Sequence, residues 1–175
     1  MNNRSNHYHF LLLCLFFVFH GFNENYPYVT PAVAGILLIN EIIAAVIAFL
    51  ISLALFRSAA KSSVFVFIFL SLNFFFGAFH DKLKSIPSLI FLSAYHILLP
   101  LIAVILITSF IILRRTKKTL SRLNKYLMVL MLVFIGLEVF SLLKHLVYSP
   151  TGFNAPAQQL SEHRTTADPD IYFIL

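Results

Sequence analysis

Long apolar stretches recur along this chain and limit the folds open to it. They occupy residues 8–22, 31–56, 62–79, 88–113 and 126–148. A helix needs about 20 apolar residues to cross the roughly 30 Å of a bilayer's hydrocarbon. Charged residues make up 11% of the chain and hydrophobic residues 59%, whereas a soluble domain is about 25% charged. These proportions indicate a membrane protein and exclude a cytosolic enzyme, a disordered chain and a secreted disulfide scaffold.

Each apolar stretch is expected to be a helix, although 62–79 alternates phenylalanine with aliphatic residues as a strand does. A lone strand leaves its backbone polar groups unsatisfied in lipid, so the helical interpretation is favoured. Pro31 suits the first turn of a helix, and Pro100 should kink the fourth span. The first stretch lacks a small-residue cleavage site after it and is interpreted as an uncleaved span. The prediction is an all-α protein, a five-helix transmembrane bundle over residues 1–148.

Basic residues lie between the apolar stretches and predict the orientation. Most of the thirteen Lys and Arg residues fall on one side, which the positive-inside rule assigns to the cytoplasm, with the C-terminus extracytoplasmic. The largest cluster contains Arg114, Arg115, Lys117, Lys118, Arg122 and Lys125. It is either a topology anchor, the simpler interpretation, or a site for anionic lipid on the cytoplasmic face. Nucleic acid is not an expected partner, because the basic residues are not interleaved with aromatic ones on one surface.

The composition changes after the fifth apolar stretch. Residues 149–170 are rich in Pro, Ser, Thr, Gln and Asn and predict an extracytoplasmic linker. Residues 171–175, the sequence IYFIL, are apolar again and are typical of the first strand of a buried parallel sheet. One strand alone is not stable. We therefore expect residues 171–175 to open an α/β domain that is otherwise missing.

The ending DPDIYFIL at residues 168–175 resembles the segment that opens the catalytic domain of membrane-anchored sulfatase-like enzymes of the alkaline phosphatase superfamily. Residues 20–25 (HGFNEN) and 73–81 (NFFFGAFHD) are also similar to membrane domains of bacterial members. The lipoteichoic-acid synthase and phosphoethanolamine transferase branches have the same layout of membrane helices and an external domain. The resemblance implies a bacterial plasma membrane protein.

The same resemblance implies a hydrolase or phosphotransferase that uses a divalent metal and a Ser, Thr or Cys nucleophile. In that family the first metal-binding aspartate follows the strand that ends here at Leu175. No catalytic or metal-binding residue is therefore carried over, no cofactor is expected in this chain, and the chain alone should be inactive.

Several polar residues interrupt the apolar stretches at the depth of the bilayer midplane or somewhat outward. They are Asn40, Glu41, Asn73, His96, Glu138 and His145. Such residues are costly in hydrocarbon and face other helices or a cavity. The first interpretation is that they hydrogen-bond across the bundle and set its register. The second is an outward-opening groove that receives a lipid head group or lipid-linked substrate.

Two functions remain open from the sequence. The chain is either the membrane anchor and lipid-substrate platform of the external enzyme, or a stand-alone five-span carrier or accessory protein. In the carrier, Glu41, Asn73, His96 and Glu138 would form an ion or solute site. No inverted repeat is visible in the sequence, although transporters commonly have one, and this favours the anchor.

Overall fold

The computed structural model describes residues 7–26 and 28–148, with the side chains of 145, 146 and 148 excepted. The described part is helical throughout and contains no strand. The helices are α1 (His9–Glu24), α2 (Pro31–Phe56), α3 (Ala59–Phe74), α4 (Phe76–Ser85), the 3₁₀ helix η1 (Pro87–Ser93), α5 (Tyr95–Arg115) and α6 (Ser121–Tyr148).

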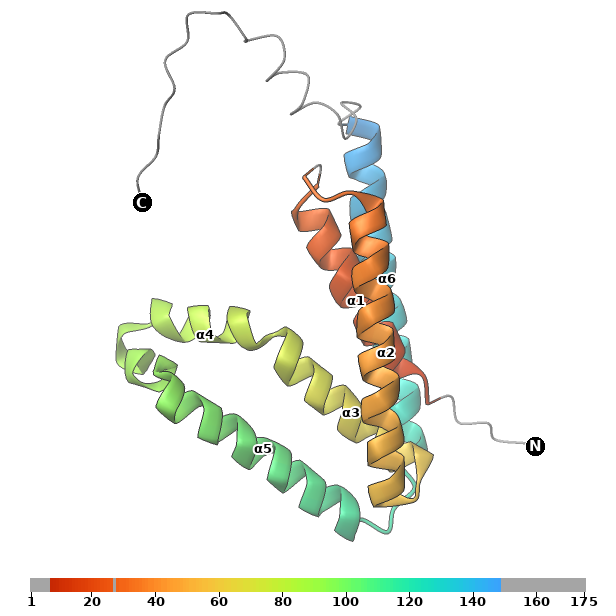
Figure 1. The fold of residues 1–175 in the computed structure, drawn as a ribbon, viewed down its shortest axis with the longest axis vertical. Helices are drawn as coiled ribbons and strands as arrows, with labels where there is room; N and C mark the ends of the chain where they lie inside the picture. The colour runs from red at the N-terminus through yellow and green to blue at the C-terminus, as the bar shows by residue number, and fades with distance from the viewer. Residues whose placement is uncertain (1–6, 27, 149–175) are drawn as a thin grey trace, which may run out of the picture.

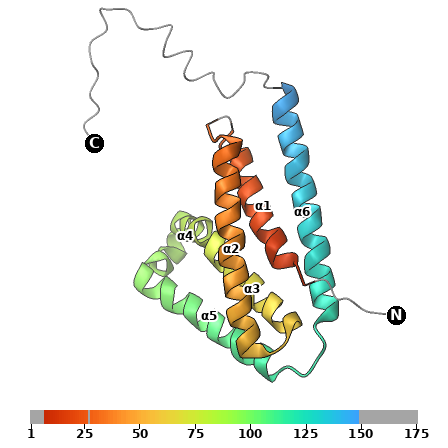
Figure 2. The same ribbon diagram turned by 45° about the vertical axis from the view of Figure 1, so that its right-hand side comes forward.

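The helices α1, α2 and α6 stand side by side, with α1 between the other two (Figure 2). Their shared core is apolar and also takes residues from α3; its buried members are Phe10, Leu13, Cys14, Ala45, Val66, Leu70 and Met131. Small residues such as Cys14 and Ala45 let the helices approach closely, which is how helices associate in a medium as apolar as their own side chains. The core therefore fixes α1 against both of its neighbours.

The helices α3, α4, η1 and α5 form an arm that diverges from α1, α2 and α6 (Figure 1). The arm begins beside α2, and α5 packs mainly on α3. The helix axis bends by 51° between α3 and α4. The bend lies at Phe75, whose backbone N–H donates a hydrogen bond to Ser71 O. A bend of this kind turns α4 out of the direction of α3. Residues 62–79 are consequently not one straight helix.

Two connections lie at one end of the molecule, which we call the basic end. It comprises residues 57–61, which connect α2 to α3 and include the first residues of α3, and residues 114–122, which connect α5 to α6 and include the adjoining residues of both helices. Arg57 has a left-handed backbone (φ 51°) and ends α2 there. Buried Asn124 ties this end together, because its amide lies 3.3 Å from both Ala60 O and His7 Nδ1 and its oxygen accepts from Ser63 Oγ at 3.3 Å.

The helices α1 and α6 run in the same direction. His7 lies beside Asn124 near the basic end, whereas Asn23, at the other end of α1, lies beside Glu138. The end of α1 and the start of α2 lie opposite the basic end (Figure 1), and we call this the far end. Thr30 caps α2 there and accepts from Val33 N at 3.5 Å.

The structure bears out a helical chain suited to a membrane, but it does not confirm a five-helix bundle. Three helices, α2, α5 and α6, are long and apolar enough to cross a membrane, and the bent pair α3–α4 raises the number to four in the described residues. The 16 residues of α1 extend only about 24 Å at 1.5 Å per residue, less than the hydrocarbon thickness.

Two further expectations can be compared with the helix bounds. The stretch expected as a fourth span from residue 88 begins as η1 and becomes α-helical only at Tyr95, and Pro100 lies inside α5 without ending it. The linker at 149–170 and the strand at 171–175 lie outside the described residues.

Candidate functional site

A polar contact joins α1 to α6 in the half of the molecule toward the far end. The amide of Asn23 donates to Glu138 Oε2 at 2.7 Å and to the backbone oxygen of Glu138 at 2.9 Å. His20 Nδ1 lies 3.0 Å from Glu138 Oε1. Both carboxylate oxygens of Glu138 thus have a partner on α1, which is the arrangement a carboxylate needs when it is placed among apolar helices.

Helix geometry explains why these residues meet. His20 and Asn23 are three positions apart and so lie on one face of α1. The parallel course of α1 and α6 brings that face to the level of Glu138. Asn23 is 5% exposed, and the side chain of Glu138 is 15% exposed. The contact is therefore largely removed from the surroundings of the protein.

Two features of this contact go beyond joining α1 to α6. The side chain of His20 is 44% exposed, and its Nε2 lies 3.8 Å from Glu24 Oε1, so the ring stands between two carboxylates. Phe16 stacks on the same ring, with 5.7 Å between the ring centroids. The buried Oδ1 of Asn23 has no hydrogen-bond partner among the described residues. An unsatisfied buried acceptor costs stability. We call His20, Asn23, Glu24 and Glu138 the polar rim.

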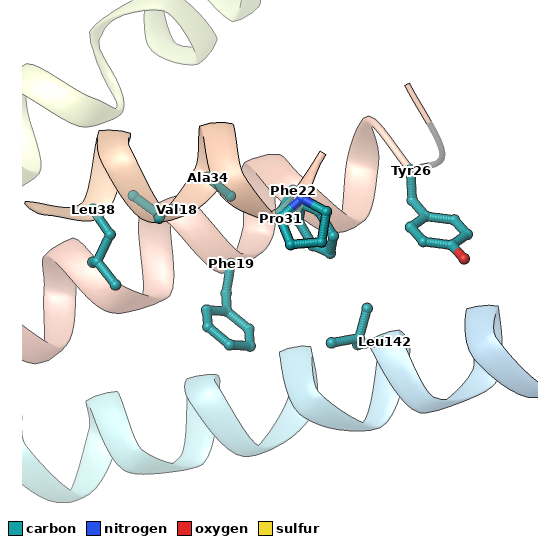
Figure 3. Close-up of a pocket in the computed structure, with 9 residues that line it drawn as sticks. Val18, Phe19, Phe22, Tyr26, Pro31, Ala34, Leu38 and Leu142 are labelled. Atoms are coloured by element: carbon teal, nitrogen blue, oxygen red, sulfur yellow. The ribbon is translucent and has the colours of Figure 1, made fainter. Parts of the chain in front are cut away.

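An apolar pocket of about 380 Å³ lies between α2 and α6 and over the end of α1, toward the same end of α1 as the polar rim, although none of the four rim residues lines it. Its lining residues are Val18, Phe19, Phe22, Tyr26, Pro31, Ala34, Gly35, Leu38 and Leu142. In Figure 3 the side chains of Phe19 and Leu142 project into the space between α1 and α6. This volume is within the range of ligand pockets, which are mostly apolar with a few polar groups at the edge.

Gly35 gives the pocket part of its width. A Cβ built on Gly35 would meet no atom within 4 Å, so a side chain could extend from this position without a clash at its first atom. The glycine is therefore not required by close helix packing. It leaves room in the pocket wall instead.

The structure brings few of the polar residues expected near the midplane together. Glu138 belongs to the polar rim, whereas Asn40, Asn73 and His96 are exposed on α2, α3 and α5. Asn73 lines a separate hollow of about 390 Å³ between α3 and α5. Glu41 is half-buried, and its backbone oxygen lies 3.8 Å from Cys14 Sγ. The side chain of His145 lies outside the described part.

This placement does not assemble the solute site that the carrier interpretation requires. That interpretation needs Glu41, Asn73, His96 and Glu138 around one point. Glu138 instead contacts two residues of α1. In the described residues no three His, Cys, Asp or Glu side chains are grouped as metal ligands.

His20 and Asn23 are members of the site that the sequence does not predict. In the sequence both stand out only as part of the segment HGFNEN at residues 20–25. The signal was present in their spacing of three residues at the end of an apolar helix. Their partner, Glu138, is 115 residues beyond Asn23 and 118 beyond His20, so the spacing alone could not identify it.

The cluster of basic residues expected as an anchor or lipid site lies at the basic end. Arg114, Arg115, Lys117 and Lys118 line a hollow there, and Lys61 from α3 joins them. Arg122 and Lys125 are exposed on the first turns of α6 and do not line this hollow. The sequence cluster is therefore divided into two parts.

Comparison with known proteins adds no relative to these observations. No protein family, curated protein or solved structure matches the chain.

Proposed function

We propose that this chain is the membrane anchor and lipid-substrate platform of an extracytoplasmic sulfatase-like hydrolase or phosphotransferase. The observation that carries the proposal is that the apolar pocket and the polar rim both lie toward the same end of α1. The pocket accommodates part of a lipid acyl chain, and the polar rim meets the head group. In this arrangement the membrane helices hold the lipid for an enzyme domain outside the membrane.

The chemistry of the two parts supports a lipid. The pocket wall is apolar apart from the Tyr26 hydroxyl, so it suits hydrocarbon better than a polar solute. The polar rim presents the exposed carboxylate of Glu24 and the partly exposed imidazole of His20, which lies against the largely buried carboxylate of Glu138. Carboxylates accept hydrogen bonds and attract cations, so the head group we propose carries O–H or N–H donors at its contact with the rim.

The sidedness of the site supports its role as a platform. The positive-inside rule assigns the basic end to the cytoplasm, which would place the pocket and the polar rim in the outer half of the membrane. Residues 168–175, which resemble the opening of a sulfatase-like catalytic domain, follow α6 and would lie on the same outer side. The lipid and the enzyme that acts on it would then meet at one surface.

The platform is tested by photocrosslinking with a phospholipid that carries a diazirine in its acyl chain. The purified full chain is reconstituted with the probe, irradiated and mapped by mass spectrometry. We expect crosslinks on the pocket segments 18–26 and 31–38. Gly35→Leu should fill the pocket and reduce these crosslinks several-fold, because the space at its Cβ is open.

Gly136→Leu is the matched control. A Cβ at Gly136 also meets no atom within 4 Å, but this glycine does not line the pocket. The control should keep the crosslinks of the unmodified chain. Equal crosslinking of the chain and both variants would mean that lipid only surrounds these helices, and the platform would be rejected.

The enzyme part has a separate test. In a form of the protein that carries this chain followed by a catalytic domain, phosphate or sulfate should be released from esters in a metal-dependent way. In that form Glu138→Gln should reduce turnover of a lipid ester more than turnover of a small soluble ester. Unchanged turnover of the lipid ester, at unchanged protein level, would remove the polar rim from the function.

A further inference from the structure

A second hollow, of about 720 Å³, lies at the basic end and is separate from the site described above. It is formed by the two connections of that end, and five of its lining residues are basic: Lys61, Arg114, Arg115, Lys117 and Lys118. None of the lining residues is acidic. Five cations around one hollow repel each other, and a bound anion would relieve this repulsion.

The helix directions add to the positive potential of the hollow. Both α3 and α6 begin there, and the hollow is lined by Ser58, which precedes α3, and by Ser121, the first residue of α6. The first amides of a helix have no partner within the helix, and the dipole makes this end positive. Ser58 occupies the cap position of α3, but its side chain does not cap the helix. The start of α3 is thus left for another acceptor, as in sites where helix ends bind phosphate.

A cluster of three aromatic rings lies next to the hollow and joins the helices around it. Phe56, Phe65 and Phe110 join the ends of α2, α3 and α5, with ring centroids 5.0 to 6.0 Å apart. The guanidinium of Arg114 lies over the ring of Phe110, 6.0 Å from its centroid. The cationic groups therefore stand directly next to the apolar part of the helices, which is where a membrane-spanning helix meets lipid head groups.

We propose that this hollow binds the phosphate of an anionic phospholipid head group. Exposed apolar side chains continue from the hollow along the helices, with Leu55 56% and Ile112 58% exposed, and they offer a surface for the acyl chains. A soluble anion would use the cations but not this surface. A topology anchor needs only charge near the membrane and does not require the charges to surround one hollow.

The test compares the purified full chain with two double variants, each of which removes two positive charges. The probes are phosphatidylglycerol and phosphatidylcholine with identical acyl chains, and native mass spectrometry measures the lipid retained. The unmodified chain should retain phosphatidylglycerol preferentially. Lys61→Gln with Arg115→Gln should weaken this retention about 10- to 30-fold, the effect of two basic residues near a charged surface. Arg122→Gln with Lys125→Gln should change it less than about 2-fold, because these residues lie outside the hollow.

Equal losses in the two pairs would show attraction by net charge and overturn the proposal, as would equal retention of the two lipids by the unmodified chain. Displacement of phosphatidylglycerol by an equal concentration of inorganic phosphate would assign the hollow to a soluble anion and also overturn it. Alkylation of buried Cys14 checks folding. If the Lys61→Gln, Arg115→Gln variant exposes Cys14, it is replaced by a variant with Lys117→Gln and Lys118→Gln, both of which are exposed residues that line the hollow. The expected loss of phosphatidylglycerol retention is the same.

Discussion

The contact of Asn23 with Glu138 should be a main support of α1 on α6. Replacing Asn23 by alanine removes two hydrogen bonds, one to the carboxylate at 2.7 Å and one to the backbone oxygen at 2.9 Å. It also leaves a buried carboxylate with one partner fewer. The substitution should therefore favour separation of α1 from α6 without adding any bulk.

The magnitude follows from the two bonds. Hydrogen bonds between membrane helices contribute about 0.6 kcal/mol on average and about 1.7 kcal/mol at most, and bonds to a charged group in water contribute about 1.5 to 3 kcal/mol. One neutral and one charged acceptor together give about 2 kcal/mol for Asn23→Ala. A change of this size multiplies the population with α1 detached by about 30.

Cys14 provides the assay, because it is the chain's single cysteine and is fully buried between α1 and its neighbours. N-ethylmaleimide can react with it only when α1 opens, so the labelling rate follows the open population when reclosing is fast. Labelling is counted by intact mass. Asn23→Ala should raise the rate about 30-fold, within a range of 5- to 150-fold for about 1 to 3 kcal/mol.

Asn25→Ala is the control, because within the described part of the chain the exposed side chain of Asn25 donates only locally, to Gly21 O at 2.7 Å. Its effect should stay below about 0.5 kcal/mol. A double-mutant cycle with Glu138→Ala isolates the side-chain pair, since the backbone oxygen at 138 survives that change, and should give about 1 kcal/mol of coupling. A rate for Asn23→Ala no higher than that for Asn25→Ala would refute the reasoning.

Three further changes can be followed by the same Cys14 labelling or by thermal unfolding. Asn124→Ala should destabilise the basic end by about 1 to 2 kcal/mol, because buried Asn124 joins α3 to α6. Ser63→Ala should cost less, since Asn124 keeps its contact with α3 at Ala60. Equal losses of stability in the two variants would contradict this. Burial lowers the pKa of His7 below 6.5, so the unfolded chain binds more protons than the folded chain. The stabilisation should be complete above about pH 6.5 and decline as the pH falls below that value. His7→Gln, which retains an acceptor for Asn124, should reduce this decline. Phe110→Ala should weaken the packing of α5 on α2 and α3 by about 1 to 2 kcal/mol. Phe110→Leu should have about half this effect. Unchanged thermal unfolding of both variants would contradict the role of the aromatic contact.

Much of the local structure could be predicted from the sequence. The apolar run of α2 begins at Pro31 and ends before Arg57, and the helix has these bounds. Backbone hydrogen bonding in an apolar medium requires a helix for such a run, whatever its neighbours are. The polar interruptions Glu41 and Glu138 were also visible in the sequence, because a charge in an apolar run stands out wherever the run packs.

Tertiary structure alone decided which of these polar residues work together. Glu138 meets His20 and Asn23, whereas Asn73 and His96 remain exposed. It also decided that the third apolar run bends after Phe74 and that α5 packs mainly on α3 rather than on α1, α2 or α6. Helix pairing in lipid depends on close packing and a few interhelical hydrogen bonds, since lipid is as apolar as the side chains. The pattern of apolar residues therefore determines helices, while the shape of their surfaces determines partners, pockets and sites.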